Sequence, residues 1–575
     1  MPVHNEDIAL KFEEMADLLE IEDANPFRVR AYRNAARTIR GLACELGEMV
    51  DAGEDLTLLP GIGKDLAGKI KEMLSTGHLQ ALDKLYKEVP ASLEDMLHIP
   101  GLGPKRVKQL YHELHIKTVK QLESAVRKGQ LRSLPGFGEK TEQRILESLQ
   151  THAVQGRRFL HNVARQYAEP LVSYLKTVSG VKEVIIAGSY RRGKETVGDI
   201  DILVTASKQS PVMRKFVDYD EVQEIVSKGT TRATVFLRNG LQVDIRVVEQ
   251  ASYGAALYYF TGSKSHNIQI RRIAQQRGLK INEYGVFKND QRIAGQSEAS
   301  VAKAVGLVLI PPELRESRGE IEAARNKQLP QLITLQDLQG DLHVHSEATD
   351  GHGTIKDMAK AAKQLGLKYI AITDHSQYLT IAHGLNEKRL HQQLEHIDKL
   401  NEKLTGITIL KGIEVDILAN GQLDLPDSVL AKLDLVVAAV HSKFRLSRSK
   451  QTKRILRAME SKYFTLLAHP SGRLLNEREA YDVDMPRIIR AAGDRGCYLE
   501  LNSQPQRLDL IDTYCQLAKE HGVLISINSD AHSTRDYAYL AGGINQARRG
   551  WLEKKDVLNS LSLRDLKRKL KATMG

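Results

Sequence analysis

Three aspartates in the middle of the chain have the spacing of metal ligands on strands. Asp199 and Asp201 open an apolar run, and Asp244 stands in a similar run at residues 241–248. Side chains alternate along a strand, so Asp199 and Asp201 are expected on the same face. Two adjacent carboxylates repel each other unless a cation lies between them, and oxygen ligands at short spacing suit Mg²⁺. With Asp244 as a third ligand, the pattern predicts a two-metal site for in-line phosphoryl transfer.

The residues before the first aspartate carry groups that suit phosphate. The apolar run 184–187 predicts a buried strand, and Gly188, Ser189 and Arg192 follow it. The backbone N–H groups of a Gly-Ser turn and a guanidinium could together hold a triphosphate. An Asp-x-Asp tripeptide alone is common on exposed strand faces. The Gly-Ser-x-Arg-Arg-Gly lead-in and the later Asp244 favour the metal site over that alternative.

A second set of possible ligands follows apolar runs in residues 341–575. His343 and His345 alternate on one strand, and more histidines and acids end later apolar runs, with helical stretches such as 355–365 and 508–521 between them. Alternating strands and helices with polar residues at the strands' carboxyl ends predict a (β/α) barrel with its site at the top. A single histidine after an apolar run is usually an ordinary core or loop residue. Six histidines in such positions are not explained as core or loop residues.

The types of these ligands narrow the chemistry. A set of His, Asp and Glu without sulfur suits Zn²⁺, Mn²⁺ or iron. The number of ligands indicates more than one ion, and therefore hydrolysis of phosphoesters by water that the metals activate. The three cysteines, Cys44, Cys497 and Cys515, are widely spaced and match no zinc or disulfide pattern.

Composition and charge limit the class of protein. A chain of 575 residues corresponds to about four domains of about 150 residues. It has no apolar run near the about 20 residues of a membrane span and no signal-peptide pattern, so we expect a cytoplasmic protein. Residues 1–100 hold 11 basic and 19 acidic residues, whereas residues 101–200 hold 18 and 9, which makes nucleic acid a plausible partner of the second segment. No pattern indicates a dimer face, so we expect a monomer.

A motif repeats three times in the first 150 residues. Each copy reads apolar-Pro-Gly-apolar-Gly-polar before a helical stretch, at residues 59–70, 99–107 and 134–145. The glycines permit positive φ and close approach of a phosphate, and the N–H groups of the following helix start would face it. A single copy would be read as an ordinary helix connection, but three copies resemble the helix-hairpin-helix motif, which binds the DNA backbone. The residues expected to bind DNA here are Gly61, Gly63, Gly101, Gly103, Lys105, Gly136 and Gly138.

The aspartates and their Gly-Ser turn resemble the nucleotidyltransferase palm of family X DNA polymerases. The resemblance implies that Asp199, Asp201 and Asp244 are catalytic ligands of Mg²⁺ and that Gly188, Ser189 and Arg192 contact the incoming triphosphate. Residues 254–267 resemble the nucleotide-site segment of the same family. The residues implied there are Tyr259 and Phe260 at the sugar, Gly262 and Asn267 at the nucleotide, and Arg271 near the template.

The first repeat also resembles the amino-terminal domain of these polymerases. There a helix lysine can form a Schiff base with an abasic sugar, and Lys69 stands at the matching position. The preceding helix has Phe27 and Arg28 where the animal repair enzyme of the family has a His-Lys pair. Lys69 is therefore a candidate lyase residue, with an ordinary surface lysine as the alternative.

The ligand series of residues 341–575 resembles the PHP (polymerase and histidinol phosphatase) superfamily. The resemblance implies a distorted TIM-like (β/α)7 barrel that holds three ions, Mn²⁺ or Zn²⁺. The implied ligands are His343, His345, Asp350, His375, Glu414, His441, His469, Asp530 and His532. Among them, His343, His345 and Glu414 are also expected to be catalytic. His352 stands near Asp350 and is an alternative ligand there.

These parts predict a multidomain α/β chain. The expected domains are a helical lyase-like domain at 1–85, a fingers-like helical domain at 86–152, an α+β palm at 153–249, a thumb at 250–315, a linker at 316–340 and the PHP barrel at 341–575. The order resembles the bacterial family X DNA polymerase. That implies filling of short gaps in base excision repair, on gapped or primer–template DNA with dNTPs, and a 3′–5′ exonuclease in the barrel. The barrel could also cleave at abasic sites or act as a 3′-phosphodiesterase.

Two alternatives belong to other classes of protein. The first is a DNA-binding scaffold with a vestigial palm, against which the three retained aspartates and Arg192 argue. The second is a DNA-binding module fused to a PHP small-molecule phosphatase, because PHP relatives include histidinol phosphatases.

Overall fold

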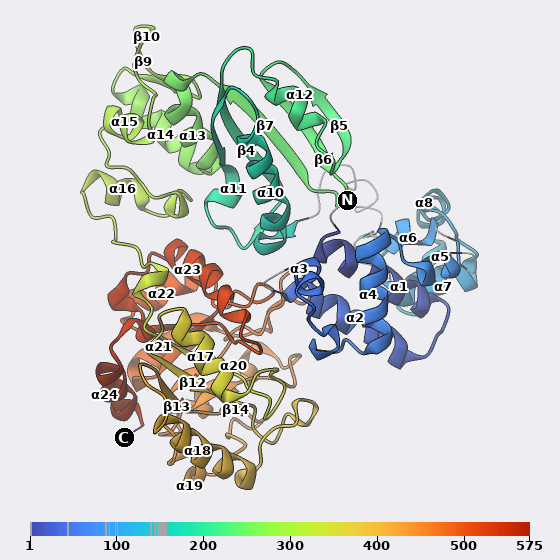
Figure 1. The fold of residues 1–575 in the computed structure, drawn as a ribbon, viewed down its shortest axis with the longest axis vertical. Helices are drawn as coiled ribbons and strands as arrows, with labels where there is room; N and C mark the ends of the chain where they lie inside the picture. Colours follow the sequence, from blue (N-terminus) through green and yellow to red (C-terminus); the bar gives the residue numbers. More distant parts are fainter. Residues whose placement is uncertain are drawn as a thin grey trace. The chain divides into compact units, whose positions relative to one another are not determined.

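The computed structural model describes residues 3–42, 45–86, 89–90, 92–97, 99, 102–138, 141–142, 145 and 158–574. The chain forms two compact units, which divide between residues 157 and 158. Helices α1 to α8 belong to the first unit, and the elements from β1 onward belong to the second (Figure 1).

The first unit is helical. Its apolar core is continuous from Ile8 to Ile145, and α1 and α2 contribute its most extensive helix pair. Asn25 caps α2 by accepting a hydrogen bond from the Phe27 N–H, with Pro26 at the first helical position, which explains the sharp break after α1. Its helices are α1 (Asn5–Ile21), α2 (Pro26–Gly41), α3 (Leu46–Asp51), α4 (Lys64–Thr76), α5 (Gln80–Leu85), α6 (Ser92–Leu97), α7 (Pro104–Leu114) and α8 (Val119–Arg127).

The second unit begins with a mixed sheet in the strand order β2-β4-β7-β6-β5. Strand β4 runs parallel to β7, and the other neighbours are antiparallel. The sheet strands are β2 (Val181–Ile186), β4 (Asp199–Ala206), β5 (Val222–Lys228), β6 (Arg232–Leu237) and β7 (Gln242–Val248). Helices α10 (His161–Lys176) and α12 (Val212–Val217) pack against it, and the short helix α11 (Gly188–Arg191) connects β2 towards β4.

One local expectation was wrong here. The run 184–187 was expected to be a buried strand, but β2 is an edge strand, and of its residues only Val184 is buried. A short strand, β1 (Phe159–Leu160), pairs with β3 (Thr196–Val197), and α10 begins directly after β1 at His161.

Residues 250–330 form a smaller α+β subdomain and a connecting segment. The subdomain consists of α13 (Tyr253–Thr261), α14 (Lys264–Gln276), α15 (Glu298–Ala304) and a three-stranded sheet of β8 (Lys280–Asn282), β9 (Gly285–Lys288) and β10 (Gln291–Ala294). The connecting segment includes α16 (Glu320–Arg325). The fully buried Glu320 accepts a hydrogen bond of 2.7 Å from His266 of α14, so this segment is attached to the subdomain.

The remaining strands are parallel and form two sheets, β11-β12-β13 and β14-β15-β16-β17-β18. Strands β13 (Thr408–Lys411) and β14 (Glu414–Asp416) belong to one run that changes neighbours at Gly412. Counted as one, the run gives seven strands with β11 (Gly340–Val344), β12 (Tyr369–Ile372), β15 (Val437–Ala439), β16 (Leu466–Leu467), β17 (Tyr498–Asn502) and β18 (Ile525–Asn528). Parallel bridges between His375 and Glu414 and between Val344 and Ala531 join the two sheets, which agrees with the expected distorted barrel.

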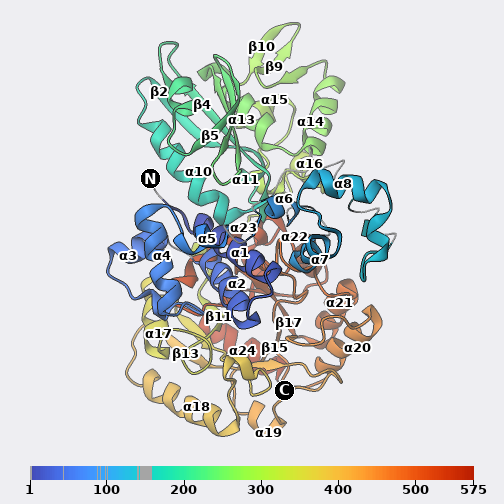
Figure 2. The ribbon, with the colours of Figure 1, turned by 90° about the vertical axis from the view of Figure 1, so that its right-hand side faces the viewer.

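Helices follow most of these strands. They are α17 (Ile355–Gln364), α18 (Glu387–Asn401), α19 (Asp427–Leu430), α20 (Arg448–Ala458), α21 (Met485–Arg495), α22 (Asp512–Glu520), α23 (Leu540–Arg549) and α24 (Leu563–Thr573). Helices α20 and α21 lie side by side (Figure 2). The helix expected at 508–521 begins only at Asp512, because Asp509 exchanges two backbone hydrogen bonds with Asn502 and Leu508 has a φ of 38°.

Candidate active sites

The three aspartates lie side by side on two neighbouring strands of the first sheet. Asp199 and Asp201 are both half-buried on β4, whereas Ile200 between them is fully buried, so the two carboxylates share a face as expected. Asp201 is the register partner of Asp244 on the parallel strand β7. The Asp244 carboxylate accepts hydrogen bonds from Thr234 Oγ1 at 2.6 Å and from Gln242 Nε2 at 2.7 Å, so both of its oxygens are already held in place.

Their charges make this a site for cations. Burial, and after it the charges of Asp199 and Asp244, raises the pKa of Asp201 to about 7. Burial and the charge of Asp244 also raise the pKa of Asp199. A bound cation would relieve this repulsion, so the three oxygen donors fit one or two hard divalent ions such as Mg²⁺.

Gly188 lies directly against one of these carboxylates. Its φ is 61°, and a Cβ atom added to it would lie 2.3 Å from Oδ2 of Asp201. Only glycine therefore allows the backbone of α11 to approach Asp201 this closely.

The two arginines that follow have different partners. Arg191 makes a two-point ion pair with Glu298 of α15 at 2.8 and 2.7 Å. Arg192 donates from Nε to Glu316 and from Nη1 to the carbonyl of Thr261, both at 2.8 Å. Arg549 of α23 donates to the same Glu316 oxygen and to the carbonyl of Arg192, both at 3.0 Å. The guanidinium expected at the triphosphate is therefore oriented by partners from two other segments.

The residues expected around the nucleotide lie on α13 and α14. Asn267 donates from its amide to the carbonyls of Tyr259 at 2.7 Å and Gly262 at 3.2 Å. A Cβ atom at Gly262 would come within 2.7 Å of the Asn267 amide oxygen, so glycine is needed there. Arg271 donates to the Tyr259 hydroxyl at 3.0 Å, and the guanidinium of Arg246 lies 4.5 Å from the ring centroid of Phe260. The aromatic side chains thus lie among cations and amides, as a nucleotide-binding surface requires.

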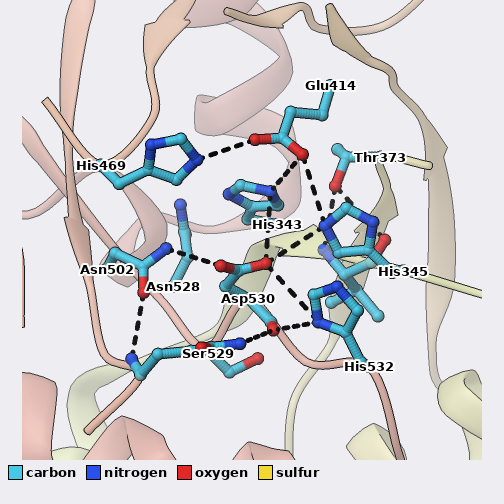
Figure 3. A network of polar contacts seen from close by, with 12 residues as sticks. His343, His345, Thr373, Glu414, His469, Asn502, Asn528, Ser529, Asp530 and His532 are labelled. Carbon is cyan, nitrogen blue, oxygen red and sulfur yellow. Dashed lines mark hydrogen bonds and ion pairs between the residues drawn. The ribbon is translucent and has the colours of Figure 1, made fainter. Parts of the chain in front are cut away.

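The barrel brings all nine expected ligands into one cluster at the carboxyl ends of its strands. Figure 3 shows six of them, which are His343, His345, Glu414, His469, Asp530 and His532. Among the described residues there are three groups in which the ligand atoms all lie within 4.8 Å of one another. They are His345, Asp350, His375 and His532; His343, His345 and Asp530; and His375, Glu414 and His441. Shared members connect the groups, and His469 joins them through Glu414, whose Oε1 lies 3.0 Å from its Nε2.

Several buried ring nitrogens in this cluster face carboxylate oxygens without hydrogen-bond geometry. They are His343 Nε2 and His375 Nδ1, at 3.5 and 2.7 Å from Oε2 of Glu414, and His345 Nδ1 and Nε2, at 3.6 and 3.1 Å from Asp350 and Asp530. Buried polar atoms normally have partners, so lone pairs that converge with carboxylates fit metal ions. Burial opposes ionisation of Glu414, but the charges of His375, His441 and His343 outweigh it and hold the pKa of Glu414 well below its usual range.

The side chain of Asp350, and not that of His352, belongs to a ligand group of the cluster. The Asp350 carboxylate lies 3.2 Å from His375 Nε2 and 3.5 Å from His532 Nε2. His352 belongs to none of the ligand groups found among the described residues.

A further layer of acids was not anticipated from the sequence. The fully buried Glu500 of β17 lies 2.7 Å from His343 Nδ1 and accepts the His469 backbone N–H at 2.7 Å. Asp416 lies 3.3 Å from His441 Nδ1. These contacts leave Nε2 of both histidines directed at the cluster, which is the usual role of a carboxylate behind a metal-bound histidine. A charged residue inside the apolar run 498–501 was the available signal for Glu500.

The repeat turns of the first unit have the expected backbone geometry. Gly61 and Gly136 have φ values of 68° and 85°, and Gly63 and Gly103 precede the first residues of α4 and α7. An added Cβ at Gly63, Gly103 or Gly138 would meet no atom within 4 Å, so these turns are open to a phosphate. Lys105 is exposed at the start of α7. Gly101 and most of the helix after the third copy lie outside the described residues.

Lys69 lies on α4 at the edge of a groove of about 790 Å³. Its side chain is 15% exposed and pairs with Asp65, and its ammonium lies 5.8 Å from the ring centroid of Tyr32. Arg28, Lys64 and Lys84 line the same groove. The lysine is thus more enclosed than an ordinary surface residue.

Comparisons with known proteins agree with these sites. Family models match a helix-hairpin-helix domain at residues 3–79, a SAM-like helix-hairpin-helix tandem at 93–151, a DNA polymerase beta palm at 161–273, a DNA polymerase beta thumb at 256–316 and a PHP domain at 341–530. The DNA polymerase/3′-5′ exonuclease PolX of Bacillus subtilis (strain 168) is 38% identical over 573 residues, which cover 99% of this chain and all of that protein. The chain belongs to the bacterial family X DNA polymerases that carry a PHP domain.

Other relatives match parts of this family X chain. A probable phosphatase of Thermoanaerobacter sp. (strain X514) is 31% identical over 38% of this chain and 89% of its own length. DNA polymerase lambda of Rattus norvegicus is 26% identical over 54% of this chain and 56% of its own length. None of the helices in the described part of the chain has the length and apolar character needed to cross a bilayer.

Proposed function

We infer that this chain is a DNA polymerase with a separate, metal-dependent 3′–5′ exonuclease in its PHP domain. The observation that carries this inference is the presence of two distinct ligand sets in one chain. One is a small, oxygen-only group of three aspartates beside a phosphate-binding turn. The other is a large, enclosed cluster of histidines and acids.

In the polymerase site, Asp199, Asp201 and Asp244 would hold Mg²⁺. The ions, when bound, would lower the pKa of the primer 3′-hydroxyl and neutralise the pyrophosphate leaving group. The chain's own contribution is positioning. The backbone N–H groups of Gly188 and Ser189 and the guanidinium of Arg192 would bind the triphosphate, and Glu316 and Thr261 orient that guanidinium. Tyr259, Phe260 and Asn267 form the surface for sugar and base, and Arg271 lies next to Tyr259 on the template side.

In the exonuclease site, His343, His345, Asp350, His375, Glu414, His441, His469, Asp530 and His532 would hold Mn²⁺ or Zn²⁺, with room for three ions in the three ligand groups. The ions would supply activated water and neutralise the phosphodiester charge. Glu500 and Asp416 fix the orientation of two imidazoles and accept their protons on the far side. His343, His345, His375 and His469 are buried, whereas His441 and His532 are partly exposed on the side open to a substrate.

We place the chain in repair of short gaps, within base excision repair, acting as a monomer in the cytoplasm on gapped or primer–template DNA. Three open helix-hairpin-helix turns would bind the DNA backbone, and Lys69 in its groove is a candidate for lyase chemistry on an abasic sugar. Cleavage at abasic sites and removal of 3′-phosphodiesters are further activities of the same PHP cluster.

The rival function is a small-molecule phosphatase in the PHP domain, for which the similarity to a probable phosphatase is the specific observation.

Three proteins test the assignment on a gapped duplex with Mg²⁺ or Mn²⁺, with and without dNTPs: wild type, Asp199→Ala/Asp201→Ala and His343→Ala. The carboxylate variant should lose extension and keep degradation of the primer, and the histidine variant should do the reverse. Normal DNA degradation by His343→Ala, together with lost hydrolysis of a phosphate monoester, would favour the phosphatase.

A further inference from the structure

The segment that follows the ligand His441 carries an unusual density of positive charge. Residues 442–462 contain eight lysines and arginines and one acid, Glu460. Three of the cations, Lys450, Lys453 and Arg457, are exposed on α20. At spacings of three and four residues they lie on one face of the helix, over a length of about 10 Å.

This face of α20 borders a groove of about 550 Å³. Arg487 and Arg495 of α21 extend the positive lining, which contains one acid, Glu460. The uncharged lining residues are Ala419, Asn420, Leu446 and Leu456. Four of the lining cations have no carboxylate within 4.0 Å in the part of the chain that the structure describes, and they are Lys450, Lys453, Arg457 and Arg487. Arg495 is the exception, at 3.4 Å from Glu460. The fold thus leaves a row of cations unneutralised.

The groove begins where two metal-ligand strands end. The turn after β14 packs against α20 at Gly421, where an added Cβ would lie 2.8 Å from Cβ of Arg457. The buried Arg454 fixes this arrangement, because it donates to the carbonyls of Leu418 at 3.0 Å and Ser442 at 2.8 Å. Ser442 directly follows His441, and Leu418 comes four residues after Glu414. A chain whose end lies in the cluster could therefore leave it along α20.

We propose that this groove binds the phosphodiester backbone of a single DNA strand whose 3′ end lies in the PHP metal cluster. The proposal rests on the exonuclease function proposed above and adds the path of its substrate. Exposed cations in a row suit successive phosphates, because binding them releases counterions without reading sequence. The lining contains no aromatic side chain, so we expect the bases to face away from the groove and the site to accept any sequence.

The test compares two alanine variants of the full chain. One is Lys450→Ala/Lys453→Ala/Arg457→Ala on α20. The control is Lys567→Ala/Lys569→Ala/Lys571→Ala, which removes the same charge from exposed positions of α24. KM and kcat are measured for degradation of oligothymidylates of two to eight nucleotides at several salt concentrations. Hydrolysis of bis(p-nitrophenyl) phosphate reports on the cluster itself.

We expect the α20 variant to raise KM for the longer strands about tenfold and to lower the salt slope of log KM by about 2, since each phosphate contact on a single strand contributes about 0.7. Its kcat and its hydrolysis of the small diester should stay within twofold of wild type, as should every value for the α24 control. Wild-type KM should fall with strand length, whereas KM of the variant should not.

The proposal is overturned if the α20 variant keeps the wild-type KM and salt slope. It is also overturned if KM of the α24 variant rises, and its salt slope falls, as much as those of the α20 variant. If the α20 variant also hydrolysed bis(p-nitrophenyl) phosphate more slowly to the same extent, the substitutions would have damaged the metal cluster. The charge-preserving variant Lys450→Arg/Lys453→Arg/Arg457→Lys should recover the wild-type KM within twofold, and failure to do so also contradicts binding by charge. Absence of DNA degradation by the wild-type chain would reject the exonuclease function rather than the groove.

Discussion

Arg473 and Glu195 join the surroundings of the two candidate active sites. Nη2 of Arg473 lies 2.6 Å from Oε2 of Glu195, and Nη1 lies 3.2 Å from Oε1. Glu195 comes three residues after Arg192, and Arg473 comes four residues after the ligand His469. Nε of Arg473 also donates to the carbonyl of Arg507 at 2.9 Å. The turn that contains Arg192 is therefore held against a loop that starts at His469, one of the expected metal ligands.

Loss of this ion pair should affect polymerisation. We expect Glu195→Gln to raise KM for dNTP by about 3- to 10-fold, because the turn that carries Arg192 loses an anchor, in line with the 0.5–3 kcal/mol of coupled pairs. Exonuclease activity should change less than twofold, since Arg473 keeps its backbone acceptors. Single-nucleotide insertion kinetics measure the first effect. The reversed pair Glu195→Arg/Arg473→Glu should recover part of the loss, and purely additive effects of the two single changes would contradict the coupling.

Gly188 should be essential for polymerisation. In Gly188→Ala the new methyl group would overlap the Asp201 carboxylate, and we expect a loss of about 100-fold in kcat, the usual cost of misplacing a catalytic group by about 1 Å. Gly240→Ala, in the turn between β6 and β7, is a matched control, since its φ is 83° but an added Cβ would meet no atom within 4 Å. Equal losses in the two variants would assign the effect to backbone strain rather than to Asp201.

The neighbouring arginines should separate nucleotide binding from stability. Arg192→Ala should raise KM for dNTP by about 10- to 100-fold, the effect of losing a charged hydrogen bond. Arg191→Ala should instead lower the free energy of unfolding, because its pair with Glu298 is mostly buried. Thermal unfolding and insertion kinetics of both variants provide the comparison. A similar KM for the two variants would show that Arg192 does not contact the triphosphate.

Polymerisation should depend on pH through Asp201. Its pKa of about 7 before a cation binds means that the carboxyl is neutral below pH 7 and ionised above pH 8. Mg²⁺ must displace that proton, so the apparent dissociation constant for Mg²⁺ should rise about tenfold for each pH unit below 7 and be constant above 8. Mg²⁺ titrations of nucleotide insertion at pH 6, 7 and 8 measure this. An unchanged constant from pH 6 to 8 would contradict it.

Glu500 should control how tightly the PHP cluster holds metal. Glu500→Gln keeps the shape of the side chain but removes the charge behind His343, and we expect metal affinity to fall about 10- to 100-fold. Exonuclease activity should be low after dialysis and return with excess Mn²⁺, whereas polymerisation stays unchanged. Metal content and Mn²⁺ dependence are the measurements. Full metal content combined with lost activity would assign Glu500 to the chemical step instead.

Features that depend on residues close together in the sequence could be predicted. Asp199 and Asp201 share a face because strand geometry requires it, and the helix-hairpin-helix turns follow from Pro-Gly-x-Gly. The family is confirmed, and the two connected parallel sheets agree with the expected distorted barrel. Contacts between distant segments were missed. Glu500 meets His343 across 157 residues and Arg473 meets Glu195 across 278, and no local pattern marks such pairs. The half-exposed β2 was missed for the same reason, because its edge position depends on the order of the whole sheet.

The break between β13 and β14 means that the expected metal ligands come from two separate sheets of the barrel. Because the run changes neighbours there, His343, His345, Asp350 and His375 come from one sheet of the barrel, and Glu414, His441, His469, Asp530 and His532 come from the other. Ions bound by ligands from both sheets would connect the two sheets to each other. The ions would then stabilise the closed barrel in addition to their role in the reaction, and the loss of one ion would weaken the binding of the others.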